Sequence, residues 1–145
     1  MQERIKIIYL IGQLGLGGSE RQLYLLLKHL DKTLFDPHVV VFNPSPYVVL
    51  NQSMEAAGVQ VYQLPDNCTS ILQRSHYLYC LFRQLSPHIV HSWTVHDNSY
   101  AGLVGFLASV PVRMGSVRSL LSAEGFQDLS FFFGCYRSTA QGCLL

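Results

Sequence analysis

The first 119 residues alternate between apolar, strand-like runs and segments whose apolar residues recur at helical spacing. The strand-like runs are rich in β-branched residues, which is typical of buried strands, and they cover residues 5–11, 38–42, 59–64, 88–92 and 111–118. The helical spacing covers residues 19–30, 47–57, 70–85 and 98–109. Strands that alternate with helices through short loops predict an α/β fold, a doubly wound, parallel, Rossmann-like sheet with helices on both faces.

Each predicted helix has an apolar face, and most have a recognisable end signal. Ser19, with Gln22 three residues later, has the spacing of a capping box, in which each side chain satisfies a free backbone N–H at the helix start. Ser70 is expected to begin the third helix, Gly58 to end the second and Pro87 to end the third. The residues expected to face the core are Leu23, Leu26, Leu27 and Leu30; Leu50, Met54 and Ala57; Leu72, Leu78, Leu81, Phe82 and Leu85; and Leu103, Phe106 and Leu107.

The pattern ends after Ser119. Residues 120–145 have neither a helical nor an alternating period, although they include the apolar run Phe131 to Phe133. We therefore predict one domain over residues 1–119 and an irregular or truncated tail over residues 120–145.

Composition excludes several classes of protein. The chain has 145 residues, a formal net charge of +1 and four cysteines, a length that suits one domain with its own core. The small net charge argues against a nucleic-acid binder that works through bulk charge, and the scattered cysteines, without a C-x-x-C pair, indicate neither a zinc site nor a disulfide framework. No apolar run approaches the length of a membrane span. A predicted strand begins at residue 5, so we expect no signal peptide and a cytoplasmic protein.

A glycine-rich loop separates the first predicted strand from the first helix. Gly12, Gly15, Gly17 and Gly18 let the backbone approach a ligand closely, and the start of the following helix offers free N–H groups and a positive dipole end to an anion. The loop is equally well explained as the sharp turn that a strand–helix unit needs. It lacks the last glycine of the dinucleotide fingerprint, since Glu20 stands there, and no G-x-x-x-x-G-K-[ST] motif is present.

A second loop, residues 93–97, follows the fourth predicted strand and is expected on the same rim of the sheet. His96 can act as a general base, orient a hydroxyl or hold a phosphate. Asp97 can hold the tautomer of His96 or cap the next helix, and Trp93 can stack on a sugar or base or simply cover the end of the sheet. His91, inside the strand, is favoured as a hydrogen-bonded core histidine.

Four stretches resemble, in order, the N-terminal domain of family-4 glycosyltransferases, which are retaining enzymes of the GT-B fold with two Rossmann-like domains facing a cleft. They are residues 4–11 (RIKIIYLI), 17–21 (GGSER), 87–93 (PHIVHSW) with His96, and 108–113 (ASVPVR). The resemblance implies transfer of a sugar from a nucleotide-sugar donor to a glycan, lipid or small-molecule acceptor, with no metal or other cofactor. It implies that this domain mainly binds the acceptor, and many relatives make peripheral contact with the inner face of a membrane. The residues assigned to the donor diphosphate or substrate are Gly17, Gly18, Ser19, Arg21, Trp93 and Asp97, and the catalytic residue is His96.

The sequence departs from this family in two places. Many members carry a histidine two positions after the one that matches His91, where this chain has Trp93, so the catalytic-side histidine is either His96 or absent. The C-terminal donor domain, with its E-x7-E motif, has no counterpart after Ser119. We therefore expect little or no transferase activity from this chain alone, because a donor held from one side is not oriented for transfer. The alternative is a non-catalytic phosphate- or nucleotide-binding module, or a truncated product without transferase activity.

Overall fold

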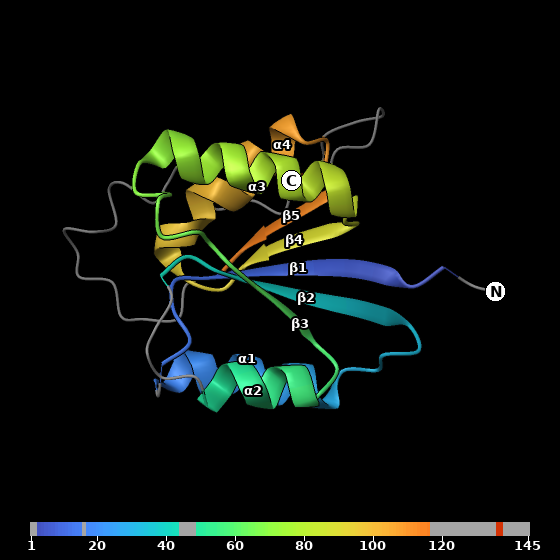
Figure 1. Ribbon diagram of the computed structural model, residues 1–145. Helices are drawn as coiled ribbons and strands as arrows, with labels where there is room; N and C mark the ends of the chain where they lie inside the picture. The colour runs from blue at the N-terminus through green and yellow to red at the C-terminus, as the bar shows by residue number, and fades with distance from the viewer. Residues whose placement is uncertain (1–2, 16, 44–48, 117–135, 138–145) are drawn as a thin grey trace, which may run out of the picture.

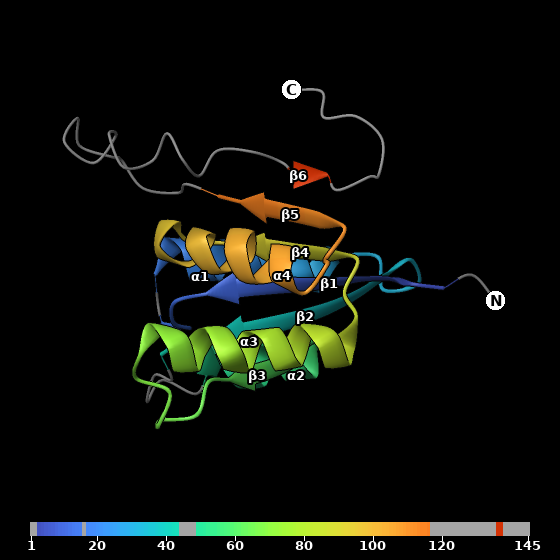
Figure 2. The ribbon, with the colours of Figure 1, turned by 90° about the horizontal axis from the view of Figure 1, so that it is seen from above.

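The computed structural model describes residues 3–15, 17–43, 49–116 and 136–137. Within them lies one six-stranded sheet in the order β3-β2-β1-β4-β5-β6 (Figures 1 and 2). The first five strands along the chain are parallel, and β6 pairs with β5 in the antiparallel direction. The strands are β1 (Ile5–Ile11), β2 (Phe35–Val41), β3 (Gln60–Gln63), β4 (Ile89–Ser92), β5 (Val112–Gly115) and β6 (Tyr136–Arg137). The predicted α/β, Rossmann-like class is confirmed.

Helices cover both faces of this sheet, and the chain changes face between β3 and β4 (Figures 1 and 2). The helices of the first face are α1 (Gly18–His29) and α2 (Val49–Ala56). The second face carries α3 (Ile71–Leu85) and a helical segment made of the 3-10 turn η1 (Val95–Asp97), the π-helical η2 (Tyr100–Val104) and α4 (Gly105–Leu107). After β3 the chain returns to the middle of the sheet, where β4 pairs with β1. None of the helices described here is long and apolar enough to cross a bilayer.

Strand β1 supplies side chains to the cores on both faces. Ile8 and Leu10 are fully buried with residues of α3 and the helical segment before β5, whereas Tyr9 and Ile11 pack with residues of α1 and α2. Successive side chains of a strand point to opposite faces, so a strand covered on both sides reads as a continuous apolar run. This explains why the sequence predicted the bounds of β1 correctly.

Strand β2 begins three residues before its predicted start at His38. Pro37 belongs to the strand and pairs in register with Ile7 of β1, although its ring removes a backbone N–H. The pairing of β2 with β3 begins only at His38, opposite Gln60. Pro37 therefore lies where β2 has a partner on one side only, and there the missing donor costs little.

The predicted inner face of the last helix is wrong. Leu103, Phe106 and Leu107 are about three-fifths exposed, and the buried positions are instead Ala101, Val104, Gly105 and Ala108. The π-helical turn changes the spacing of side chains around the axis. A Cβ on Gly105 would lie only 2.9 Å from the side chain of Arg113, so the segment packs against the sheet through small residues. In the other helices, Leu72 and Leu26 are also exposed, while Leu23, Leu27, Met54, Leu78, Leu81 and Phe82 are buried as predicted.

The observed helix ends test the capping residues that the sequence predicted. Ser70 begins α3 with a complete capping box, because its hydroxyl accepts from the N–H of Gln73 and the Gln73 side chain accepts from the N–H of Ser70. Gly58 follows α2 with a φ of +76°, the left-handed conformation that ends helices. The predicted capping box at Ser19 is wrong: the N-cap of α1 is Gly17, and the Ser19 hydroxyl donates to Glu20 instead. The tail at residues 120–145, apart from β6, and the predicted domain boundary at residue 119 lie outside the described residues.

We predict that Ser70→Ala lowers the free energy of unfolding by about 1 kcal/mol, because it removes a capping hydroxyl from α3. Ser99→Ala is the matched control, and we expect it to change stability by less than about 0.5 kcal/mol because Ser99 is exposed and its side chain makes no cap hydrogen bond. Urea denaturation followed by circular dichroism measures both. Equal losses in the two variants would contradict this assignment of the caps.

Candidate functional site

The candidate site lies at the carboxyl ends of β1 and β4, where the strand order reverses. In doubly wound sheets this switch point opens a crevice between loops that diverge to opposite faces. The two loops meet directly here: the indole N–H of Trp93 donates to the backbone carbonyl of Ser19 across 2.8 Å. A Cβ on Gly12 would lie 3.9 Å from the Thr94 hydroxyl and 4.0 Å from an Asp97 carboxylate oxygen. The prediction that both loops lie on one rim is confirmed.

The buried side chain of Trp93 joins the two loops of the rim. Its side chain is only 3% exposed, and its ring meets Tyr9 and His91 edge to face, with centroids 5.9 and 5.3 Å away. Of the two roles that the sequence left open, the structure places Trp93 in the one that covers the end of the sheet. A buried ring offers no free face on which a sugar could stack. His91 is half-buried, and its Nε2 lies 2.7 Å from the Ser116 hydroxyl, as expected for a hydrogen-bonded histidine.

The loop after β4 presents one exposed and one buried ionisable side chain. His96 is exposed, whereas Asp97 is only 4% exposed and accepts a hydrogen bond from the Thr94 hydroxyl. Burial raises the pKa of the Asp97 carboxyl, and the Thr94 hydrogen bond and the charges of His96 and Arg74 offset part of that rise. The carboxylate is therefore held by Thr94, not by His96, and His96 is free to reach a ligand in solution.

The loop after β1 brings the remaining predicted residues to the start of α1. Gly17 is the N-cap, Gly18 is the first helical residue, and both are exposed. Arg21 is also exposed, and its backbone N–H donates to the Gly17 carbonyl at 3.2 Å. Ser19 is half-buried, and both of its polar groups are used within the protein, the hydroxyl by Glu20 and the carbonyl by Trp93.

Two polar residues at the rim were not predicted from the sequence. Arg74, in the first turn of α3, donates to the carbonyl of Cys68 at 3.0 Å and to the Asn43 side chain at 3.3 Å. The N–H of Asn43 in turn donates to the Gly12 carbonyl at 2.8 Å, which ties the loop after β2 to the glycine loop. An arginine on a helix surface carries no sequence signal of its own. Only the strand order shows that it reaches the rim.

The arginine of β5, Arg113, lies away from the rim. Its side chain is 6% exposed and donates to the Val110 carbonyl at 2.7 Å, with the guanidinium over the Phe106 ring. Its position is interior, so it is not a candidate for contact with a phosphate at the rim.

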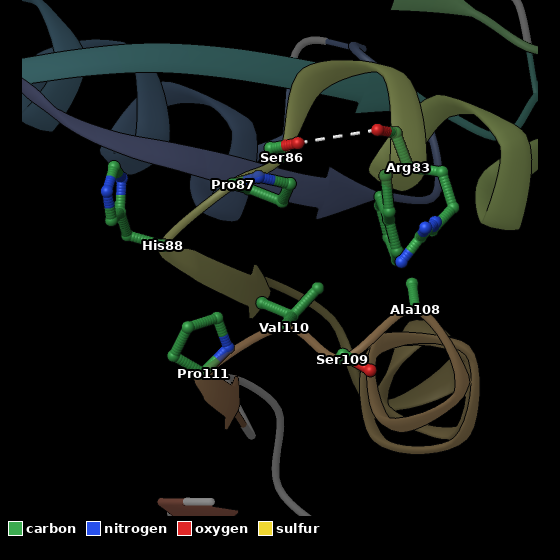
Figure 3. A pocket seen from close by; sticks show the side chains of 9 residues that line it. Arg83, Ser86, Pro87, His88, Ala108, Ser109, Val110 and Pro111 are labelled. Atoms are coloured by element: carbon green, nitrogen blue, oxygen red, sulfur yellow. Dashed lines mark hydrogen bonds between the residues drawn. The ribbon is translucent and has the colours of Figure 1, made fainter.

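A hollow lies at the opposite end of the sheet, before β4 and β5 (Figure 3). The C-terminal ends of α3 and α4 line it, and its polar side chains include those of Arg83, Ser86 and Ser109. Ser86 and Ser109 have positive φ values of 47° and 60°, as the residue that ends a helix often does. This hollow is formed by ordinary helix ends. In the described part of the chain, no three His, Cys, Asp or Glu side chains come together as a metal site requires.

Comparison with known proteins finds a solved structure of similar fold. No known protein family and no curated protein matches the sequence. The structure is similar to that of HepE from Anabaena, solved in complex with UDP and glucose, with a TM-score of 0.62 at 18% sequence identity. The match covers 83% of this chain but 32% of HepE, so the chain spans about a third of the length of that protein. The likeness shows a shared Rossmann-like fold.

We predict opposite pH dependences for two aspartates. Because burial raises the folded-state pKa of Asp97, its carboxyl contributes stability that is present below its ordinary value of 3.8 and is lost as the pH rises through the higher folded-state value. Asp97→Asn should remove this loss and still accept the Thr94 hydrogen bond. Asp31 is the control, because hydrogen bonds from Thr33 lower its pKa. Its contribution is present above 3.8 and is lost as the pH falls through the lower folded-state value.

Urea denaturation of the wild type, Asp97→Asn and Asp31→Asn between pH 3 and pH 8 tests both predictions. Asp97→Asn should gain stability relative to the wild type as the pH rises, and Asp31→Asn should lose it. The same pH slope in both variants would contradict the burial of Asp97.

Proposed function

We propose that this domain binds a nucleotide sugar at the rim beyond β1 and β4 and takes part in transfer of the sugar. The observation that carries the proposal is the meeting of the two loops there, joined by the hydrogen bond from Trp93 to Ser19. The HepE structure, of the same fold, contains UDP and glucose, which together make up the parts of a nucleotide sugar. The motif resemblance to family-4 glycosyltransferases supports the same activity.

In this proposal the start of α1 receives the diphosphate of the donor. Gly17 and Gly18 are exposed and allow close backbone approach, and the first turn of a helix favours an anion. Arg21, exposed on the same turn, supplies a positive charge. His96 serves the acceptor, as a base or as the group that orients its hydroxyl, because it is exposed on the neighbouring loop. Trp93 and Asp97 support these groups from the interior.

Several finer features of the activity are also proposed. They are a retaining mechanism of the family-4, GT-B type without a metal, an acceptor that is a glycan, a lipid or a small molecule, and a cytoplasmic setting with peripheral membrane contact. They depend on the motif resemblance. Because the chain spans about a third of HepE, we propose that transfer also needs a donor-binding domain to hold the nucleotide sugar from the other side. The second candidate is a module that binds nucleotide or phosphate without catalysis, since the exposed start of α1 by itself suits an anion.

We predict that UDP shifts the backbone amide NMR signals of residues 12–19 and 93–97 in the isotopically labelled chain and leaves those of Ser86 and Ser109 unchanged. Arg21→Ala should weaken UDP binding about two- to fivefold, as expected for loss of an exposed charge pair. Arg83→Ala removes another exposed arginine, at the opposite end of the sheet, and should have no effect. Shifts centred on Ser86 and Ser109, or no UDP binding at all, would overturn the proposal.

The effect of substituting His96 distinguishes a transferase from a non-catalytic binding module. In a polypeptide that joins this domain to a donor-binding domain, His96→Ala should lower kcat about 10²- to 10⁴-fold, the range for loss of a general acid–base group. His29→Ala, which changes an exposed histidine at the far end of α1, should leave kcat unchanged. Release of UDP from a panel of UDP-sugars with candidate acceptors measures both. Equal kcat values for His96→Ala and the wild type would remove His96 from the mechanism.

A further inference from the structure

Glu20 has an unusual position for a charged residue in the first turn of a surface helix. It is only 9% exposed, whereas Arg21 and Gln22, the next two residues, are exposed. The Ser19 hydroxyl donates to its Oε2 at 2.8 Å. A Cβ on Gly17 would clash with Oε2 and would lie 3.0 Å from Cδ. The carboxylate is thus folded back over the Cα of the N-cap residue.

This position satisfies an electrostatic need of α1. The N-cap of α1 is Gly17, which has no side chain to cap the helix, so the first N–H groups and the positive dipole end of α1 are open to an anion. Gly17 leaves the space that the Glu20 carboxylate occupies. In the described part of the chain, no lysine, arginine or histidine forms a salt bridge with Glu20. The start of α1 therefore carries an anion of its own.

We propose that Glu20 determines how strongly the glycine loop binds a diphosphate, because its carboxylate competes with the ligand for the start of α1. This inference rests on the proposed function, which places the diphosphate at Gly17 and Gly18. Two negative groups near one helix end repel each other, and inside a partly buried site water screens that repulsion weakly. A diphosphate binds there by displacing the Glu20 carboxylate from Gly17. The affinity of the loop for an anion is thereby set by a residue that stabilises the empty protein.

The test compares two Glu→Gln variants of the full 145-residue chain. Glu20→Gln keeps the size of the side chain and can still accept from Ser19, but it removes the charge. Glu55→Gln makes the same change in net charge on an exposed glutamate near the end of α2, away from the rim. Titration calorimetry with UDP should show about tenfold tighter binding for Glu20→Gln. The affinity of Glu55→Gln should stay within about twofold of the wild type.

The thermal stability of Glu20→Gln without ligand is a second readout, and we expect it to fall while the affinity for UDP rises. Because the carboxylate complements the dipole of α1, Glu20→Gln should lower Tm by about 1 to 4 °C in the absence of ligand. Tighter UDP binding together with lower stability is the result expected of competition at one helix end. A simple structural role for Glu20 predicts lower stability without tighter binding.

The outcomes distinguish this inference from the proposed function. UDP binding by the wild type that is unchanged or weakened in Glu20→Gln overturns the role of Glu20 and leaves the proposed function standing. If neither protein binds UDP, the proposed function fails, and inorganic pyrophosphate is titrated against Glu20→Gln by NMR. Shifts of the Gly17, Gly18 and Ser19 amides in that variant, and not in the wild type, then support the competition. Their absence overturns it.

Discussion

Parallel pairing of β1 with both β2 and β4 is the constraint on which the rest of this structure depends. All seven residues of β1 pair with β2, and Ile7 to Leu10 also pair with β4, so the strand lies in the middle of the sheet. Its side chains alternate between two cores, and Ile8, Leu10 and Ile11 are fully buried. Burying such side chains supplies much of the driving force for folding. The chain runs from β2 and from β4 to helices on opposite faces of the sheet. The loops beyond these strands therefore diverge, and the rim lies between them at the carboxyl end of β1.

The rim is then held in shape by hydrogen bonds between its own groups. A buried indole N–H needs a hydrogen-bond acceptor, and Trp93 finds it in the carbonyl of Ser19, which joins the loop after β4 to the start of α1. Ser92, fully buried, donates to the Thr94 carbonyl at 2.8 Å, and the Thr94 hydroxyl donates to Asp97. A chain of satisfied buried polar groups of this kind fixes a single loop conformation. The exposed residues, Gly18 and His96, are therefore presented from a rigid base.

The sequence predicted correctly those features whose signals lie within a few residues of one another. The Ile5–Ile11 run, the helix start at Ser70 and the helix end at Gly58 are encoded within a few residues, and all were predicted. Ser19 shows the limit of that approach. Its spacing to Gln22 matches a capping box, but Gly17 and Gly18 let the helix begin earlier and move Ser19 inside it.

The prediction of the inner face of the last helix failed because that face depends on a residue distant in the sequence. Apolar size favours Leu103 and Phe106 as core residues, but the side chain of Arg113 reaches from β5 against Gly105 and brings a small-residue face inward. The glycine loop and the loop at residues 93–97 were both predicted as parts of the rim, because parallel strands end on the same edge. The burial of Trp93 was only one of two alternatives and that of Glu20 was not predicted, since burial depends on contacts between elements far apart in the chain.

The charges of the rim also bear on the ligand that it suits. The two buried acids, Glu20 and Asp97, lie at the start of α1 and in the neighbouring loop, and the basic side chains near them are those of Arg21, Arg74 and His96. A bare anion would meet repulsion from both acids, whereas the backbone N–H groups and the cations would favour it. Both carboxylates already accept hydrogen bonds within the protein, Glu20 from Ser19 and Asp97 from Thr94. Charge alone therefore gives the rim no strong preference for an anion, and a ligand bound there has to gain affinity from further contacts.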